Sequence, residues 1–325
     1  NKKRMGQWIV IAAAIGLFCS SQALAKKPPK PPEDEAPRGY TLVALDASPG
    51  FARSVALDVE TSGGVTLAVG QMEEADEDMA MLWTVTASES GYQVETNYLA
   101  GGAGATGVNA QGEAVGGRTA IDSDLQTWDY EGLYWPSVDD MPALLAPLPG
   151  DNGAAPWKIN DDGLIVGRSI RKYETTNEAG QTEIHEETTA AFWSTGFTNG
   201  NGELVASELS DQPSVFSVAR DINQCNADGI AQIVGIVQGL GPALWLVDRE
   251  SLVSTGPITL TPDDMRGWAL GINNAGDACG DHGAVPYRVL ADGTHEELAI
   301  RRNFRANAND IGENRLVVGI VWELN

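Results

Sequence analysis

The stretch Ala-Leu-Gly-Ile-Asn-Asn-Ala-Gly-Asp-Ala-Cys-Gly, residues 269–280, is one copy of a short phrase that recurs six times along this chain. In this phrase a small residue comes first and is followed by a β-branched or small apolar residue, an Asn, a Gly in the turn, and an apolar stretch that ends in a second, closing Gly. Clear copies also occupy residues 105–116 and 159–167, and in all three the closing Gly follows the Asn by seven residues. Looser copies lie at 219–235, 306–319 and 56–70, the last of which lacks the Asn. A repeat of this kind indicates an array of similar units.

Each unit contains signals for four short strands. Asn-x-x-Gly between two apolar runs is typical of a hairpin, because Asn caps the turn and Gly accepts the positive φ. A third strand is indicated by a recurring aromatic after apolar residues, and a fourth strand follows it; the aromatics are Trp83, Trp135, Trp193, Trp245 and Tyr287. The 287 residues from 39 to 325 give six units of about 48 residues each. The sequence therefore predicts an all-β fold, a β-propeller with six blades of four antiparallel strands, with a β-solenoid as the alternative.

The last copy stops after its second strand, at Val317-Val-Gly-Ile-Val-Trp322. Near the other end of the sequence, Tyr40-Thr-Leu-Val-Ala-Leu45 precedes the first copy and is similar to the fourth strand of a unit. We expect this segment to join the last sheet, which would close the ring and remove exposed sheet edges.

The phrase Ala-x-x-Ile-Asn-x-x-Gly-x-x-Val-Gly, followed by Ala-Phe-Trp or Ala-Leu-Trp, resembles the bacterial extracellular HAF repeat family. The similarity is strongest at Ile272-Asn-Asn-Ala-Gly276 and at Ile159-Asn-Asp-Asp-Gly163 with Ala191-Phe-Trp193, and it spans most of residues 40–322. The resemblance implies export and a repetitive β fold. It implies no common activity.

The N-terminal region is typical of export. Residues 1–25 combine Lys2, Lys3 and Arg4 with an apolar core and a small-residue end at Ala23-Leu-Ala25, which is the pattern of a secretory signal peptide. Residues 26–38 contain five prolines among charged residues and are interpreted as an extended linker. The folded array is expected at residues 39–325, in the periplasm or outside the cell.

The formal net charge of −24 limits the classes of partner. A strongly acidic protein repels phosphate backbones and anionic lipid surfaces, so we expect neither nucleic acid nor membrane binding. We expect a monomer.

Few residues suggest catalysis or metal binding. The three histidines, His185, His282 and His295, do not have metal-ligand spacing, and no nucleophile motif is present, so no catalytic residue is predicted. Asp221, Asn223 and Asp228 precede Gly229 with oxygen side chains, which raises a weak hypothesis of a Ca²⁺ loop against that of a lengthened turn. Cys225 and Cys279 could form a disulfide after export, or remain free with Cys279 buried.

Two insertions lie outside the repeat register. Residues 168–188 are expected to form a projecting β-ribbon in which Arg171 and Lys172 face a Glu-rich return arm, and residues 118–131 form a second insertion in the preceding unit. Because both fall between second and third strands, we expect them to project from neighbouring blades on one face. The predicted binding residues are Trp128, Tyr130, Arg171, Lys172 and Tyr173.

These features favour a noncatalytic β-propeller that binds a glycan or an envelope or extracellular protein. The alternative is a propeller glycoside hydrolase or lyase that uses carboxylates in a central funnel.

Overall fold

The computed structural model describes residues 43, 45, 53–74, 77–89, 91–122, 127–209, 215–261, 267–300 and 304–323. The predicted signal peptide and linker lie outside these residues. The described chain consists of 22 strands joined by turns and loops, arranged in six antiparallel sheets. No helix within the described ranges has the length and apolarity needed to cross a membrane.

Five of the sheets have four strands each, and we number the sheets in chain order. Sheet 1 contains β1 (Arg53–Ser62), β2 (Val65–Glu74), β3 (Glu77–Ser88) and β4 (Gly91–Tyr98). Sheet 2 contains β5 (Gly104–Val108), β6 (Ala114–Asp122), β7 (Thr127–Trp135) and β8 (Ala143–Leu145). Sheet 3 contains β9 (Gly153–Ile159), β10 (Leu164–Thr176), β11 (Thr182–Ser194) and β12 (Ser207–Glu208).

The remaining sheets continue the same order. Sheet 4 contains β13 (Ser217–Ile222), β14 (Ile230–Val237), β15 (Gly241–Asp248) and β16 (Val253–Thr259). Sheet 5 contains β17 (Trp268–Ile272), β18 (Ala278–His282), β19 (Val285–Val289) and β20 (His295–Glu297). Sheet 6 contains only β21 (Phe304–Ile311) and β22 (Val317–Glu323) among the described residues.

The strand assignments made from the sequence are confirmed at the level of the all-β fold. The five predicted aromatics lie on the third strands of sheets 1 to 5 and are fully buried; they are Trp83, Trp135, Trp193, Trp245 and Tyr287. Every sheet is an antiparallel meander in chain order, unlike the coils expected of a solenoid.

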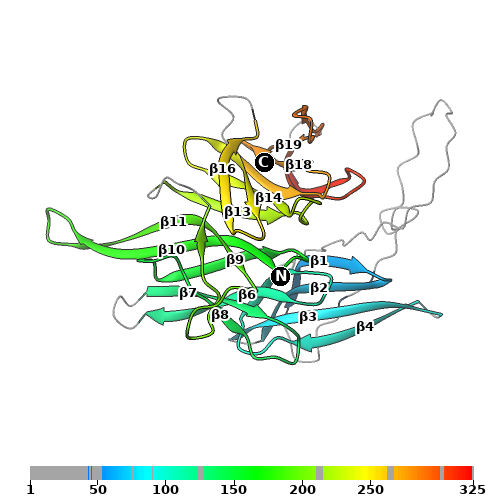
Figure 1. Ribbon diagram of the computed structural model, residues 1–325, viewed down its shortest axis with the longest axis horizontal. Helices are drawn as coiled ribbons and strands as arrows, with labels where there is room; N and C mark the ends of the chain where they lie inside the picture. The colour runs from blue at the N-terminus through cyan, green and yellow to red at the C-terminus, as the bar shows by residue number, and fades with distance from the viewer. Residues whose placement is uncertain are drawn as a thin grey trace, which may run out of the picture.

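Consecutive sheets pack through their first strands. β5 contacts β1 and β2, β9 contacts β5 and β6, β13 contacts β9 and β10, β17 contacts β13 and β14, and β21 contacts β17 and β18. Figure 1 shows sheets 1 to 3 in the lower part of the view and sheets 4 to 6 in the upper part, with the β10–β11 ribbon extending beyond the body. This is a propeller-like succession of sheets.

The closing Gly of the phrase is explained by a β-bulge that all six sheets share. Each first strand has one extra residue opposite its second strand, which shifts the register. A Cβ at the closing Gly would overlap a carbonyl oxygen of the bulged strand, as at Gly235 against Val218 and Gly280 against Trp268. Only glycine leaves room for the backbone at this point.

The Asn of the phrase has two functions, of which the sequence indicated one. Its Oδ1 caps the hairpin turn, as when Asn160 accepts hydrogen bonds from the N–H groups of Asp162 (3.1 Å) and Leu164 (2.9 Å). Its Nδ2 donates to a carbonyl of the next sheet, which links sheets 2 to 6 in series. The bonds run from Asn109 to Asn160 (3.1 Å), Asn160 to Asn223 (2.9 Å), Asn223 to Asn273 (3.3 Å) and Asn273 to Gly312 (3.2 Å).

The register predicted for the last copy was wrong. The bulge lies between Ala308 and Asp310, so Ala308 takes the place of the small residue and Gly312 the place of the Asn. Asn309, which aligns with the Asn of the phrase when the copy is taken to begin at Ala306, is instead the bulged residue. The misreading arose because two Ala-Asn pairs lie two residues apart at positions 306–309.

Of the segment predicted to complete the last sheet, only Val43 and Leu45 are described, and neither is in a strand. Leu45 packs against sheet 1, in the cluster that contains Met81 and Trp83. In the described residues, β22 pairs only with β21.

Candidate functional site

A cavity of about 670 Å³ lies where the first strands of the six sheets converge. All six bulged residues line it: Leu57, Thr106, Trp157, Arg220, Leu270 and Asn309. A bulge twists the strand locally and turns a side chain away from the sheet face. The same irregularity that requires the closing Gly therefore directs one side chain of each sheet toward a shared space.

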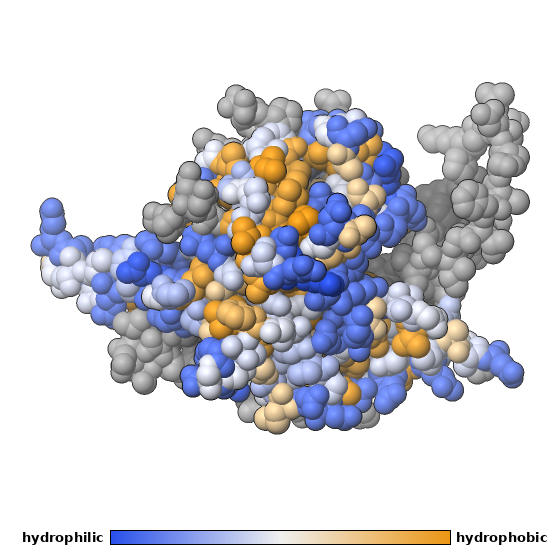
Figure 2. All heavy atoms as spheres, viewed as in Figure 1, coloured by the Kyte–Doolittle hydropathy of each residue, from blue (hydrophilic) through white to orange (hydrophobic). Residues whose placement is uncertain are grey.

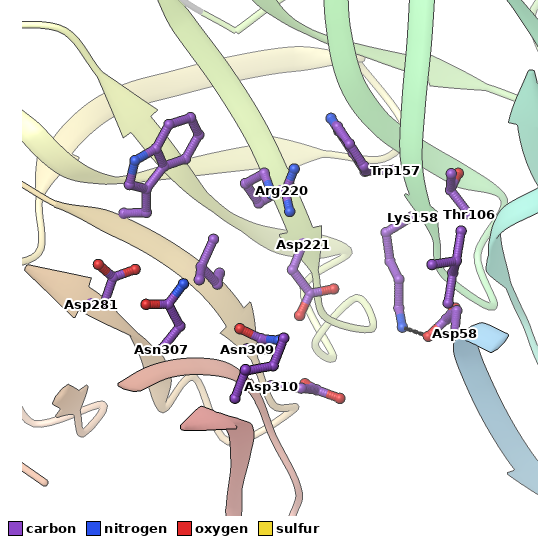
Figure 3. Close-up of a pocket in the computed structure, with 14 residues that line it drawn as sticks. Asp58, Thr106, Trp157, Lys158, Arg220, Asp221, Asp281, Asn307, Asn309 and Asp310 are labelled. Carbon is purple, nitrogen blue, oxygen red and sulfur yellow. Dashed lines mark hydrogen bonds and ion pairs between the residues drawn. The ribbon is translucent and has the colours of Figure 1, made fainter. Parts of the chain in front are cut away.

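The residue after each bulge sets much of the charge of the cavity. In chain order these residues are Asp58, Gly107, Lys158, Asp221, Gly271 and Asp310. The two glycines lie where the next sheet comes closest, since a Cβ at Gly107 would be 2.8 Å from Lys158 Cα and one at Gly271 would be 2.7 Å from Asp310 Cα. The other four positions carry ionisable side chains that line the cavity (Figure 3).

Lys158 is the cation among these four residues. Its ammonium forms an ion pair with Asp58 Oδ1, drawn as a dashed line in Figure 3. Burial by itself lowers the pKa of Lys158, but the carboxylates of Asp58, Asp221 and Asp310 outweigh it and raise the pKa above its ordinary value. The ammonium is therefore charged at neutral pH.

Two of the carboxylates also join neighbouring sheets. Asp58 Oδ2 accepts a hydrogen bond from the N–H of Val108 in sheet 2 (2.9 Å). Asp221 Oδ2 accepts from the N–H of Ile272 in sheet 5 (2.7 Å), and its Oδ1 accepts from Ile222 (2.9 Å). Burial raises the pKa of Asp221 to about 7, against the lowering effect of Lys158 and the two N–H groups. Asp221 thus holds a proton for part of the time near neutral pH.

Trp157, Arg220 and Trp268 form another part of the cavity wall. The Arg220 guanidinium carbon lies 4.0 Å from the centroid of the Trp157 ring, a close cation–π contact. Trp268 lines the cavity and meets Phe216 edge to face, with ring centroids 6.3 Å apart. Asp281 and Asn307 also line this space (Figure 3). The cavity thus combines aromatic surface, hydrogen-bonding groups and charges of both signs.

The predicted ribbon is present, and its residues lie beside those of the second insertion. β10 and β11 pair so that Arg171 is opposite Glu187 and Lys172 opposite Glu186. Lys172 Nζ lies 5.5 Å from the centre of the Tyr130 ring on β7, and Arg171 lies over Tyr173 at 5.3 Å. The side chain of Trp128 is outside the described part. The ribbon surface is mainly hydrophilic, whereas apolar side chains reach the surface over β13, β14 and β16 (Figure 2).

The residues suggested for a Ca²⁺ loop do not converge. Asp221 lines the central cavity, and Asn223 donates to Gln232 Oε1 (3.0 Å) and to Asn273 O. Asp228 lies in an exposed turn with Cys225 and Asp248. The turn is a lengthened hairpin capped by Asn226, which accepts from Asp228 and Ile230.

Cys225 and Cys279 are both free thiols in the structure, without a disulfide between them. Cys279 on β18 is buried against Ala308 and Ile311 of sheet 6, and its Sγ lies 3.6 Å from Ala308 O. Cys225 faces sheet 3 instead, where its N–H donates to Asp162 Oδ2 (2.9 Å). The two thiols point to different neighbouring sheets, because one lies on the second strand of its sheet and the other in the turn before it.

Sequence reasoning missed most of the cavity. Asp221 was noticed only as a possible Ca²⁺ ligand. Five other lining residues were not singled out: Lys158, Asp58, Arg220, Trp157 and Asp310. A signal did exist: these residues occupy the two x positions of Ala-x-x-Ile-Asn, or their equivalents in the looser copies. Those positions differ from copy to copy while the flanking residues stay similar.

No protein-family model and no curated protein matches this chain. The resemblance to the HAF repeat family stays a hypothesis.

Proposed function

We propose that this chain is an exported six-bladed β-propeller that acts as a noncatalytic binding module, with its ligand in the central cavity. A glycan is the ligand class that best suits the lining. Aromatic rings offer flat surface for a sugar ring, and carboxylates and amides accept or donate hydrogen bonds to hydroxyl groups. An envelope or extracellular protein would be bound through such a glycan or through the ribbons.

The observation that carries this proposal is that one bulged side chain from every sheet lines a single cavity of about 670 Å³. This volume is within the usual range for small-molecule sites. The bulged positions include Trp157, Arg220 and Asn309, which place aromatic, cationic and amide groups on the wall of this one cavity.

The ring itself is supported by a repeated leucine. Leu99, Leu145, Leu209, Leu260 and Leu298 lie in or just after the fourth strands, and each packs in the core between its own sheet and the next. Leu45 packs in the equivalent core of sheet 1, against Trp83. This placement favours residues 40–45 as the fourth strand of the last blade.

The test is a thermal-shift and calorimetric screen of the mature protein against neutral and acidic oligosaccharides, followed by Trp268→Ala. A ligand that binds the folded state raises the melting temperature, and loss of one aromatic wall should weaken binding about tenfold or more. Tyr92→Ala is the matched control, because Tyr92 is an exposed aromatic on β4 that does not line the cavity. Equal affinities of both variants and wild type would contradict the proposed site.

One observation favours the enzymatic alternative. Asp221 has a pKa raised to about 7, while Asp58 is paired with Lys158, so the cavity holds two carboxylates in different electrostatic environments. Such a difference is what a general acid and its partner require in glycoside hydrolysis. Release of reducing ends from an oligosaccharide by wild type, but not by a folded Asp221→Asn variant, would establish the enzyme. If wild type binds an oligosaccharide and releases no reducing ends from it, the binding module is favoured.

The ribbons are proposed as a second contact surface, for a protein partner. Tyr130 and Lys172 come from neighbouring sheets and lie together, and Arg171 and Tyr173 extend the same surface. Replacing residues 171–186 by a short Gly bridge should leave the fold intact and weaken capture of the partner. Unchanged capture by this deletion and by Trp128→Ala/Tyr130→Ala would place the contact elsewhere.

A further inference from the structure

Arg220 differs from the other half-buried arginines of the described chain. Arg168 lies 3.9 Å from Glu186, and Arg288 lies 2.6 Å from Glu296, so each faces a carboxylate. Within the described residues, the guanidinium of Arg220 has no ion pair and no hydrogen bond; its one specific contact is the ring of Trp157. The five N–H donors of this group are therefore available in the cavity wall.

The neighbours of Arg220 do not bind its guanidinium. Asp221, the next residue, attracts the guanidinium but makes no ion pair with it, and both of its oxygens accept backbone N–H groups, from Ile222 and Ile272. Arg168 is close enough to repel Arg220, and burial together with this second cation lowers the pKa of Arg220. A half-buried cation in this position gains most from an anion that enters the cavity.

The shape and charge of the site limit which anion fits. A guanidinium that stacks on an indole presents its edge, and a planar carboxylate can take two parallel hydrogen bonds from that edge. A phosphate monoester carries about 1.5 to 2 negative charges at pH 7, against one for a carboxylate, and would bring this larger charge close to Asp221, Asp310 and Asp281, which line the same cavity.

We propose that the ligand of the central cavity is an acidic saccharide, and that Arg220 binds the carboxylate of a uronic acid unit. The sugar ring then lies in the space bounded by Trp268, Asn307 and Asn309, whose side chains supply aromatic surface and amide groups. This inference rests on the proposed function, because it names the ligand class of the same site.

The test compares uronic acid oligosaccharides with their methyl esters, which keep the sugar rings and remove the negative charge. Oligomers of galacturonate, glucuronate and mannuronate are titrated into the mature protein by calorimetry. We expect at least one acid to bind about tenfold or more tightly than its ester. In Arg220→Gln the acid and its ester should bind equally, and in Arg220→Lys the preference should fall but persist, because the charge remains and the paired donors are lost.

Arg53→Gln is the matched control, since it removes the same positive charge from an exposed ion pair with Glu73 outside the cavity. It should keep the full preference. Melting curves of both Arg220 variants verify the fold. If Arg220→Gln does not fold, Arg220→Lys still tests the proposal, because it keeps a cation near Trp157. Equal binding of acid and ester by wild type, or preferential binding of a sugar phosphate, would overturn the carboxylate assignment and leave the proposed function intact. If no saccharide binds, acidic or neutral, both proposals fail.

Discussion

Sheets 4 and 5 pack closely on each other, whereas sheets 6 and 1 leave the equivalent positions exposed among the described residues. Val234 of β14 is fully buried against Ala269 and Ala278 of sheet 5. Its equivalent in sheet 6, Val318, is 48% exposed. On the receiving side, Ile272 of sheet 5 is 6% exposed, whereas its equivalent in sheet 1, Val59, is 36% exposed.

The hydrogen-bonding groups of the two regions differ in the same way. Asn223 and Asp221 of sheet 4 both bond to backbone groups of sheet 5. In sheet 6 the Asn position is Gly312, which has no side chain to donate, and Asp310 Oδ1 accepts from its own neighbour Ile311 (2.7 Å). No hydrogen bond joins sheets 6 and 1 within the described residues. In the described part of the chain, the polar links that join sheets 4 and 5 therefore have no counterpart between sheets 6 and 1.

The largest effect is expected from placing a charge in the contact between sheets 4 and 5. Val234→Asp buries a carboxylate without a partner and should destabilise the protein by more than about 4 kcal/mol. Val318→Asp should cost less than about 1 kcal/mol, because the side chain is already half exposed. Urea unfolding of both variants measures the difference. Equal losses would mean that sheet 6 packs on sheet 1 in solution as sheet 4 packs on sheet 5.

The next effect concerns the Asn links. Asn160→Ala removes a bond to sheet 4 and leaves the N–H of buried Leu164 without its acceptor, so we expect a loss of about 2 to 3 kcal/mol in the free energy of unfolding. Asn177→Ala is matched to it, since Asn177 caps the exposed ribbon turn through Ala179 and Gln181 but links no sheets. Its cost should be below about 1 kcal/mol. Similar costs would show that the Asn acts only as a turn cap.

A smaller effect is expected on the sheet 1 side of this comparison. Leu45→Ala should cost about 1 to 2 kcal/mol, because Leu45 is partly buried against Trp83 and Met81. Deleting residues 39–46 should lower the melting temperature further, and deleting residues 26–38 should leave it unchanged. Equal melting temperatures for these two deletions would rule out closure of the ring by residues 40–45.

The smallest effect concerns pH. The pKa of Asp221 is raised to about 7 in the folded protein, above its ordinary value, so the folded state holds a proton that the unfolded chain releases. The stability from this group is full below about pH 4 and is lost as pH rises through about 7. The melting temperature of Asp221→Asn should therefore fall less between pH 5 and pH 8 than that of wild type. Parallel curves would mean that Asp221 is ionised throughout this range.

The sequence could predict those parts of the fold that depend on local chemistry. Asn-x-x-Gly defined the first hairpin in the clear copies of the phrase, and the recurring aromatics marked the third strands, because turn capping and burial of large rings act over a few residues. The ribbon at residues 168–188 and its pairing were predicted for the same reason. The last copy was misaligned because Ala306-Asn-Ala-Asn309 offers two local matches, and only pairing with β22 distinguishes them.

The sequence by itself determined the repeating unit, its strands and the acidic character of the chain. Only the tertiary structure decided that Asp58, Lys158, Asp221 and Asp310 lie in one cavity, and that Arg220 stacks on Trp157 there. These residues are far apart in the chain, and although they occupy equivalent positions of the repeat, their side chains differ from copy to copy. What unites them is the bulge: it occurs at the same point of every first strand, and the packing of consecutive sheets turns six separate irregularities toward one space.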